Sequence, residues 1–139
     1  MKRTILATAI FLLGVSGFAQ QMATGYVFED QNENGKKDRN ESGIANVSVS
    51  NSQQVVVTDT NGKYEIPVGD DNIIFVIKPS GYVPKINENN LPEFYYIHKP
   101  NGSPKSEFAG VKPTGKLPKS IDFGLIPSEE KETFTALIF

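Results

Sequence analysis

The apolar residues beyond Gln20 come in short runs rich in β-branched and aromatic residues, and none of these runs keeps a helical period over three turns. Short runs of this kind, bounded by Gly, Pro and Asn, indicate β-strands. The expected strands cover residues 24–29, 44–50, 55–58, 63–67, 73–78, 94–97 and 121–126. Many short strands at short spacing predict an all-β chain that folds as an antiparallel β-sandwich.

Two places in this pattern predict more than a strand. Asn61-Gly62 lies between the runs 55–58 and 63–67 and predicts a hairpin turn. An oxygen cluster made by Asp59, Asn61 and Gly62 is the less favoured alternative at this position. The run 73–78, IIFVIK, is continuously apolar up to its last residue, so we expect a central strand that is covered on both faces.

The first nineteen residues have the organisation of a secretory signal peptide. Lys2 and Arg3 precede an apolar run that is too short to span a membrane, and Gly17 and Ala19 place small residues before a cut at Gln20. We therefore expect a protein that is secreted, periplasmic or on the cell surface and has no transmembrane span.

Composition limits how the chain after the signal peptide is stabilised and which partners it binds. About 120 residues follow Ala19, enough for one modest core. The formal net charge of −2 argues against a nucleic-acid partner, and the absence of cysteine excludes disulfides. Such a domain depends on its core and on any ion that it binds.

Three parts follow from these patterns: the signal peptide at 1–19, a sandwich domain at 20–127, and a linker with a further strand at 128–139. Residues 99–119 are rich in Pro, Gly and Lys, which predicts a long loop or arm. The run 133–139, TFTALIF, is typical of a buried strand, and we expect it to begin a second domain.

The stretch from Asp30 to Glu41, DQNENGKKDRNE, matches the EF-hand calcium-loop pattern D-x-[DN]-x-[DN]-G-x₅-E at every specified position. Calcium prefers hard oxygen ligands, and alternate residues of a tightly wound loop point such oxygens inward. Gly35 permits the sharp bend of the loop. The expected ligands are five side chains and the backbone carbonyl of the lysine, namely Asp30, Asn32, Asn34, Lys36, Asp38 and Glu41.

Because a strand precedes the loop, we expect an EF-hand-like calcium loop on a β scaffold. The pattern contains only three carboxylates, so binding should be weak, at about 10⁻⁴ to 10⁻³ M. The Ca²⁺ should be structural, since Asp30, Asp38 and Glu41 would repel one another without it. The alternative is an ordinary Asn/Gly turn with solvated charges.

No catalytic constellation can be assembled from these residues, so we expect that the chain itself is not an enzyme. The sequence has no cysteine nucleophile and no Gly-x-Ser-x-Gly motif, and its one histidine, His98, lies beside Lys99 and Pro100 at a strand end. The phrase at 69–73 approaches the phosphoesterase metal motif Gly-Asp-x-x-Asp but carries Ile73 in place of the second Asp.

The span 25–68 resembles the calcium-binding B-type repeats of bacterial serine–aspartate adhesins. The shared phrases are Gly-x-Val-Phe-x-Asp before the loop, Gly-Ile-x-x-Val after it, and Thr-Asp-x-Asn-Gly-x-Tyr in the expected turn. The resemblance implies an Ig-like or prealbumin-like sandwich whose loop holds calcium.

Almost the whole chain after the signal peptide is similar to the N-terminal domain of secreted bacterial calcineurin-like metallophosphoesterases. The phrases that carry this similarity are VIKPSGY at 76–82, FYYIHKPNGS at 94–103 and IDFGLIP at 121–127. In that family the sandwich precedes the catalytic domain, and residues 134–139 match that domain's first strand. The resemblance implies a phosphoesterase parent whose two-metal site begins beyond Phe139.

The resemblances leave two functions open. The first is a non-catalytic, calcium-stabilised accessory domain, whose arm at 99–119 packs on a catalytic domain in the same polypeptide. The alternative is a free-standing surface or adhesive calcium-binding Ig-like module. The coding sequence beyond Phe139 distinguishes the two.

Overall fold

The computed structural model describes residues 20–129, which contain eight β-strands and no helix. The strands are β1 (Gln21–Glu29), β2 (Ser48–Ser50), β3 (Val55–Val57), β4 (Lys63–Val68), β5 (Asn72–Val76), β6 (Tyr82–Pro84), β7 (Tyr95–His98) and β8 (Phe123–Pro127). The expected signal peptide at 1–19, and the expected linker and strand from residue 130 onward, lie outside the described residues.

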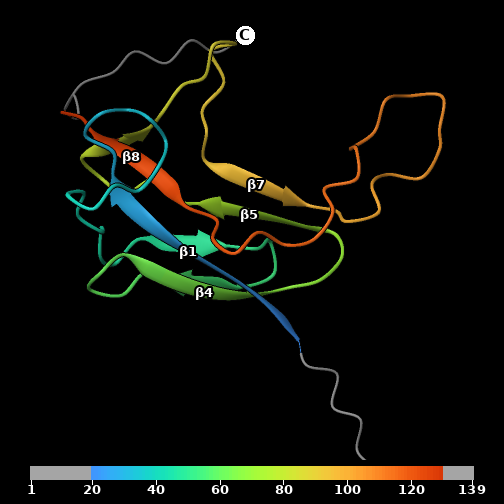
Figure 1. Ribbon diagram of the computed structural model, residues 1–139, viewed down its shortest axis with the longest axis horizontal. Coiled ribbons are helices and arrows are strands. Elements are labelled where there is room, and N and C mark those ends of the chain that lie inside the picture. Colours follow the sequence, from blue (N-terminus) through green and yellow to red (C-terminus); the bar gives the residue numbers. More distant parts are fainter. Residues whose placement is uncertain (1–19, 130–139) are drawn as a thin grey trace, which may run out of the picture.

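The strands form two four-stranded sheets, in the orders β4-β1-β8-β6 and β3-β2-β5-β7 (Figure 1). Every strand pair is antiparallel except β1 with β8, which run parallel. The predicted all-β sandwich is confirmed, and the parallel pair is a feature that the sequence did not predict.

A single core lies between the two sheets. Along β4, Tyr64, Ile66 and Val68 are buried, whereas Lys63 and Glu65 are exposed, as expected for a strand with one face on the core. Burying a Val, Ile or Leu side chain stabilises the fold by about 1.5–3 kcal/mol. The buried hydrophobic residues of this core are Ala23, Val27, Val47, Val49, Tyr64, Ile66, Val68, Ile74, Val76, Ile121, Phe123 and Leu125.

Tyr64 ties β4 to the segment before β8. Its hydroxyl donates to the carbonyl oxygen of Ile121 at 2.7 Å. Burial, and secondly the charge of Asp122, raise the pKa of this phenol, so the donor proton is retained. Gly25 lies against the same carbonyl, because an added Cβ there would approach the Ile121 oxygen to 1.8 Å. Only glycine fits at that position.

The predicted hairpin at Asn61-Gly62 is a turn, but the strands that it joins do not pair with each other. β3 pairs with β2, and β4 pairs with β1 in the opposite sheet. The turn therefore carries the chain from one sheet to the other. Its residues determine the local bend, whereas the core determines the strand partners.

β5 lies between β2 and β7, as expected for an interior strand, but only one of its faces is covered by residues 20–129. Asn72, Ile74 and Val76 face the core and are buried, whereas Ile73 and Ile77 are each 45% exposed. The prediction of a strand covered on both faces is therefore wrong for the part of the chain that is described.

Two smaller differences concern strand length. The expected strand at 44–50 is reduced to β2, and Asn46 before it has a left-handed backbone with φ of 60°. β6 was not predicted, because its three residues carry no alternating pattern and include Pro84. It pairs with β8 at the edge of the first sheet.

Residues 99–119 contain no strand or helix and project from the sandwich as a long loop (Figure 1, orange). Between residues 20 and 129, no helix is long and apolar enough to cross a membrane.

Candidate metal centre

The acidic loop, residues 30–41, leaves the end of β1 and returns to it (Figure 1, cyan). Its ends are joined by the Glu29 N–H, which donates to the Ser42 carbonyl at 2.9 Å, and by the bridge between Phe28 and Gly43. Gly35 has a φ of 73°, which glycine adopts without strain. The loop therefore closes on itself, with its polar side chains close to its own backbone.

Asp30 is fully buried at the start of the loop. Its Oδ1 accepts a hydrogen bond from the Asn34 N–H at 3.1 Å, and its Oδ2 accepts one from the Gly35 N–H at 2.7 Å. Gly124 of β8 lies directly against this carboxylate, since an added Cβ would come within 2.8 Å of Oδ2. β8 thus leaves room for a buried charge that the loop backbone surrounds.

Glu41 closes the other side of the loop and is 4% exposed. Its Oε1 accepts from the Gln31 N–H at 3.1 Å, and its Oε2 accepts from the Asp38 N–H at 2.8 Å. One carboxylate therefore ties the backbone near the start of the loop to the backbone near its end.

The two asparagines and Asp38 complete the loop. The side-chain amides of Asn32 and Asn34 both donate to Asp38 Oδ2, each at 2.9 Å. Their Oδ1 atoms accept from the backbone N–H groups of Asn34 and Lys36, at 3.0 and 2.7 Å. The structure thus brings the predicted ligand residues into one hydrogen-bonded loop.

Within residues 20–129, no cationic side chain forms an ion pair with the carboxylate of Asp30 or Glu41. The carboxylates of Asp30 and Glu41 accept hydrogen bonds only from backbone N–H groups of this part of the chain. The amine of Lys37 donates instead to the Glu41 carbonyl oxygen, at 2.8 Å, and lies over the Tyr26 ring. Buried carboxylates without a cation are costly, and a hard divalent cation is the group that would compensate them.

No three acidic or histidine side chains of the described chain lie close enough to hold a metal ion by themselves. An ion in the acidic loop would therefore also need the amide oxygens of Asn32 and Asn34 and the carbonyl of Lys36. All of these donors are hard oxygens, which suit calcium.

The turn at residues 59–62 packs against β1 and against Gly43, which follows the acidic loop. Asp59 Oδ1 accepts from the N–H groups of Asn61 and Lys63, both at 2.8 Å, so these residues form the turn favoured from the sequence. The Val27 N–H donates to the Gly62 carbonyl at 2.8 Å. A Cβ at Gly43 would approach the Asn61 oxygen to 1.8 Å. The turn thus packs directly against the end of the loop.

His98 is more deeply buried than its position at a strand end indicated. It is 1% exposed, and neither ring nitrogen has a hydrogen-bond partner among the described residues. It lies at the end of β7, opposite Asn72 of β5. It is not part of the acidic loop, and no sequence pattern signalled its burial.

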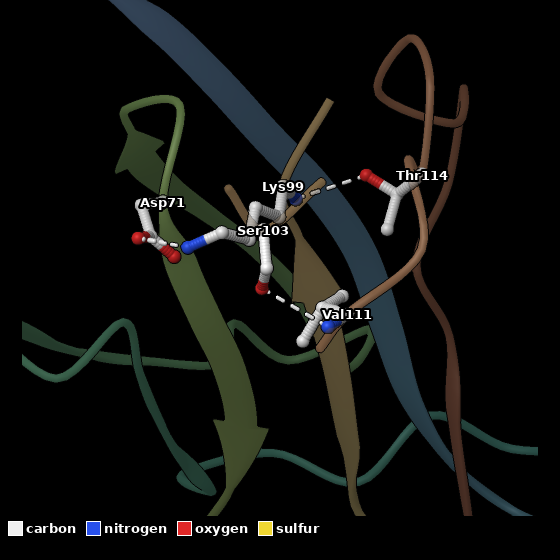
Figure 2. A network of polar contacts seen from close by, with 5 residues as sticks. All are labelled: Asp71, Lys99, Ser103, Val111 and Thr114. Atoms are coloured by element: carbon white, nitrogen blue, oxygen red, sulfur yellow. Dashed lines mark hydrogen bonds and ion pairs between the residues drawn. The ribbon is translucent and has the colours of Figure 1, made fainter. Parts of the chain in front are cut away.

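The arm, residues 99–119, is attached at its base by a second network (Figure 2). The Lys99 N–H donates to Thr114 Oγ1 at 2.9 Å, and the Val111 N–H donates to Ser103 Oγ at 3.0 Å. The Lys99 amine forms an ion pair with Asp71, which precedes β5. These contacts draw the two sides of the arm together where it leaves β7.

The tip of the arm has few contacts with the sandwich. Ser106 bonds locally to Phe108, whose side chain is 82% exposed. A large aromatic side chain at such a position gains nothing from the core of its own domain.

Comparison with known proteins gives one family and two partial relatives. Residues 31–113, more than half of the chain, match the family described as the N terminal of calcineurin-like phosphoesterase. Colossin-A of Dictyostelium discoideum is 44% identical over 54 residues, which are 37% of this chain and 0% of that protein. Serine-aspartate repeat-containing protein F of Staphylococcus epidermidis is 43% identical over 68 residues, 42% of this chain and 4% of that protein. The chain thus spans a very small part of either relative.

Proposed function

The chain belongs to the family of N-terminal domains of calcineurin-like phosphoesterases, and on this premise we propose that it is a calcium-stabilised, non-catalytic accessory domain of a secreted metallophosphoesterase. The sandwich precedes the catalytic domain in the same polypeptide. That domain supplies the two-metal site and the hydrolase activity, whereas residues 20–127 hold no catalytic residue.

In this proposal, Ca²⁺ is held by the side chains of Asp30, Asn32, Asn34, Asp38 and Glu41 and by the carbonyl of Lys36. The ion neutralises the acidic loop and fixes its closed form; it takes no part in chemistry. Binding to the folded chain alone stabilises it by mass action.

The observation that carries the calcium proposal is the burial of Asp30. This carboxylate is 0% exposed and accepts hydrogen bonds from two backbone N–H groups. No amine within residues 20–129 forms an ion pair with it. A solvated turn, the alternative considered for this sequence, would leave such a carboxylate in water.

The division of labour between the domains is tested with a phosphatase assay. The whole protein should hydrolyse p-nitrophenyl phosphate in the presence of Mn²⁺, and residues 20–139 alone should not. Turnover by residues 20–139 alone, abolished by chelation and by Asp30→Ala, would contradict a non-catalytic role.

Export is proposed from residues 1–19. Expression of the full sequence in a bacterial host should release a protein whose first residue is Gln20, as read by N-terminal sequencing. A chain that keeps Met1 in the cytoplasm would contradict the signal peptide.

The arm is proposed to contact the catalytic domain or to border its cleft. The two sides of its base are joined by Lys99 and Thr114, Lys99 pairs with Asp71, and its tip presents Phe108 to the outside. A fixed base with an exposed aromatic tip suits contact with a neighbouring surface.

A second candidate is a free-standing surface or adhesive module that binds calcium. The similarity to serine-aspartate repeat-containing protein F favours it. The coding sequence that follows Phe139 separates the two: a metallophosphoesterase domain supports the accessory role, and a stop codon or further sandwich repeats support the module.

A further inference from the structure

The outer face of the β3-β2-β5-β7 sheet exposes several large apolar side chains. Val55 and Val57 of β3 are 58% and 57% exposed, Ile73 and Ile77 on β5 and just beyond it are each 45% exposed, and Tyr95 of β7 is 49% exposed. We call these five residues the apolar face.

The strand register places these residues on one side of the sheet. Ser50 of β2 lies opposite Val55 on one side and Phe75 on the other, and Phe75 lies opposite Tyr95. Successive side chains of a strand alternate between its faces, so Ile73 and Ile77 share the side of Phe75. The apolar face therefore lies on β3, β5 and β7, and the residues of β2 on the same side are Ser48 and Ser50.

The outer face of the other sheet is mixed: Met22, which is 39% exposed, lies opposite Pro67, and charged residues lie beside this pair. There Lys63 and Glu65 of β4 lie opposite Tyr26 and Thr24 of β1, and both charged residues are exposed. Polar and charged residues are what a sheet presents to water when nothing covers it. The apolar face exposes more large apolar side chains and to a greater extent, which favours its being covered in the whole protein.

One end of the apolar face leads into an apolar pocket. The pocket has a volume of about 380 Å³ and is lined by Ile77, Pro84, Pro92 and Phe94, among others. A concave apolar site at the end of a flat apolar surface can receive an aliphatic or aromatic anchor from a partner.

The described chain leaves the sandwich at this same end. Leu125 of β8 and its partner Pro84 of β6 both line the pocket, and three residues beyond Leu125 the Ser128 N–H donates to the Gly81 carbonyl at 2.8 Å. The expected linker, residues 128–132, spans at most about 18 Å even when fully extended. A domain that begins after it must therefore lie close to the pocket.

We propose that the apolar face and its pocket are the docking surface for the catalytic domain of the same polypeptide. This inference rests on the proposed function, which supplies that domain. Docking there covers the outer face of β5, which the sequence IIFVIK predicts to be buried on both sides.

Single-cysteine labelling tests this directly, because the chain has no cysteine of its own. Ile73→Cys reports on the apolar face, and the matched control Glu65→Cys reports on the outer face of the other sheet. Both are made in residues 20–139 and in the whole protein, with any cysteines of the catalytic domain replaced. The rate of reaction with a polar maleimide is then measured, and reaction in urea gives each site's unprotected rate.

The Ile73→Cys variant should react at least about tenfold more slowly in the whole protein than in residues 20–139, because a packed interface excludes water and reagent. The Glu65→Cys variant should react at the same rate in both. Equal rates for Ile73→Cys in both proteins would overturn the inference. Protection of Ile73→Cys in residues 20–139 that grows with protein concentration would also overturn it, since a second copy would then be the occupant.

A second variant covers the case in which the introduced thiol disturbs packing. Ile77→Glu should enlarge the radius of gyration of the whole protein in small-angle scattering, and Glu65→Lys should not. An unchanged radius for Ile77→Glu, in a whole protein that retains phosphatase activity, would overturn the docking surface and leave the proposed function intact. A downstream sequence without a phosphoesterase domain would overturn both.

Discussion

The acidic loop and the arm are both long excursions from the sandwich, but they use their polar groups in opposite ways. In the acidic loop, side-chain oxygens accept hydrogen bonds from backbone N–H groups of the loop itself, and Asp30 and Glu41 are buried. In the arm, the polar contacts lie at the base, and the tip leaves Phe108 82% exposed. The loop therefore serves the stability of its own domain, whereas the arm is available to another surface.

Asp30→Ala is expected to lower the free energy of unfolding more than any of the other variants below. The variant removes both oxygens that accept the Asn34 and Gly35 N–H groups, and each unpaired donor costs about 1–3 kcal/mol. Urea unfolding in calcium buffer should show a loss of about 3 kcal/mol. Glu33→Gln, an exposed position in the same loop, is the control and should change stability by less than about 0.5 kcal/mol. Equal stabilities of the two variants would remove the distinction between loop and arm.

Gly124→Ala is expected to give the second-largest loss of unfolding free energy. Its Cβ would lie 2.8 Å from Asp30 Oδ2 and 3.1 Å from the Phe28 ring, and overpacking of this kind costs about 1–3 kcal/mol. We expect a loss of about 2 kcal/mol in urea unfolding. The control is Gly69→Ala, whose nearest contact is 3.5 Å. A Gly124→Ala protein as stable as this control would show that the Asp30 carboxylate is not confined.

A smaller loss of stability is expected for a substitution at the base of the arm. Thr114→Val removes the hydroxyl that accepts the Lys99 N–H, and loss of one such bond costs about 1 kcal/mol. Thermal unfolding should therefore show a modest decrease, with exposed Thr60→Val as the matched control. A loss as large as that of Asp30→Ala would mean that the arm is part of the fold in the same way as the loop.

The smallest effect on stability is expected at the tip of the arm. Replacing residues 105–109 by one glycine should change the stability of residues 20–139 by less than about 0.5 kcal/mol, since loop length contributes weakly. The same replacement should alter activity or domain association in the whole protein. If neither changes, the arm has no contact with the catalytic domain.

The sequence predicted those features that depend on local pattern. The run 63–67 beside the Asn61-Gly62 turn predicted a strand, and β4 covers Lys63–Val68. The spacing from Asp30 to Glu41 indicated a closed loop with inward oxygens, and the hydrogen bonds of both residues follow that spacing.

The features that were missed depend on residues far apart in the chain. The turn at Asn61-Gly62 specifies a bend, but it cannot specify that β3 and β4 belong to different sheets. The parallel pairing of Val27 with Phe123 joins segments from the two ends of the domain. The apolar pattern of IIFVIK predicted two covered faces, and only the inner one is covered within residues 20–129.

Calcium titration of residues 20–139, after dialysis against a chelator, tests the structural role of the acidic loop most directly. Calorimetry should show one saturable site, with a dissociation constant of about 10⁻⁴ to 10⁻³ M. At about 10 mM Ca²⁺ such a site adds about 1.4–2.7 kcal/mol of stability, so the melting temperature should rise by several degrees. Asp30→Ala should abolish both effects. No binding heat and an unchanged melting curve would contradict the calcium site and leave residues 30–41 as a loop held by its own hydrogen bonds.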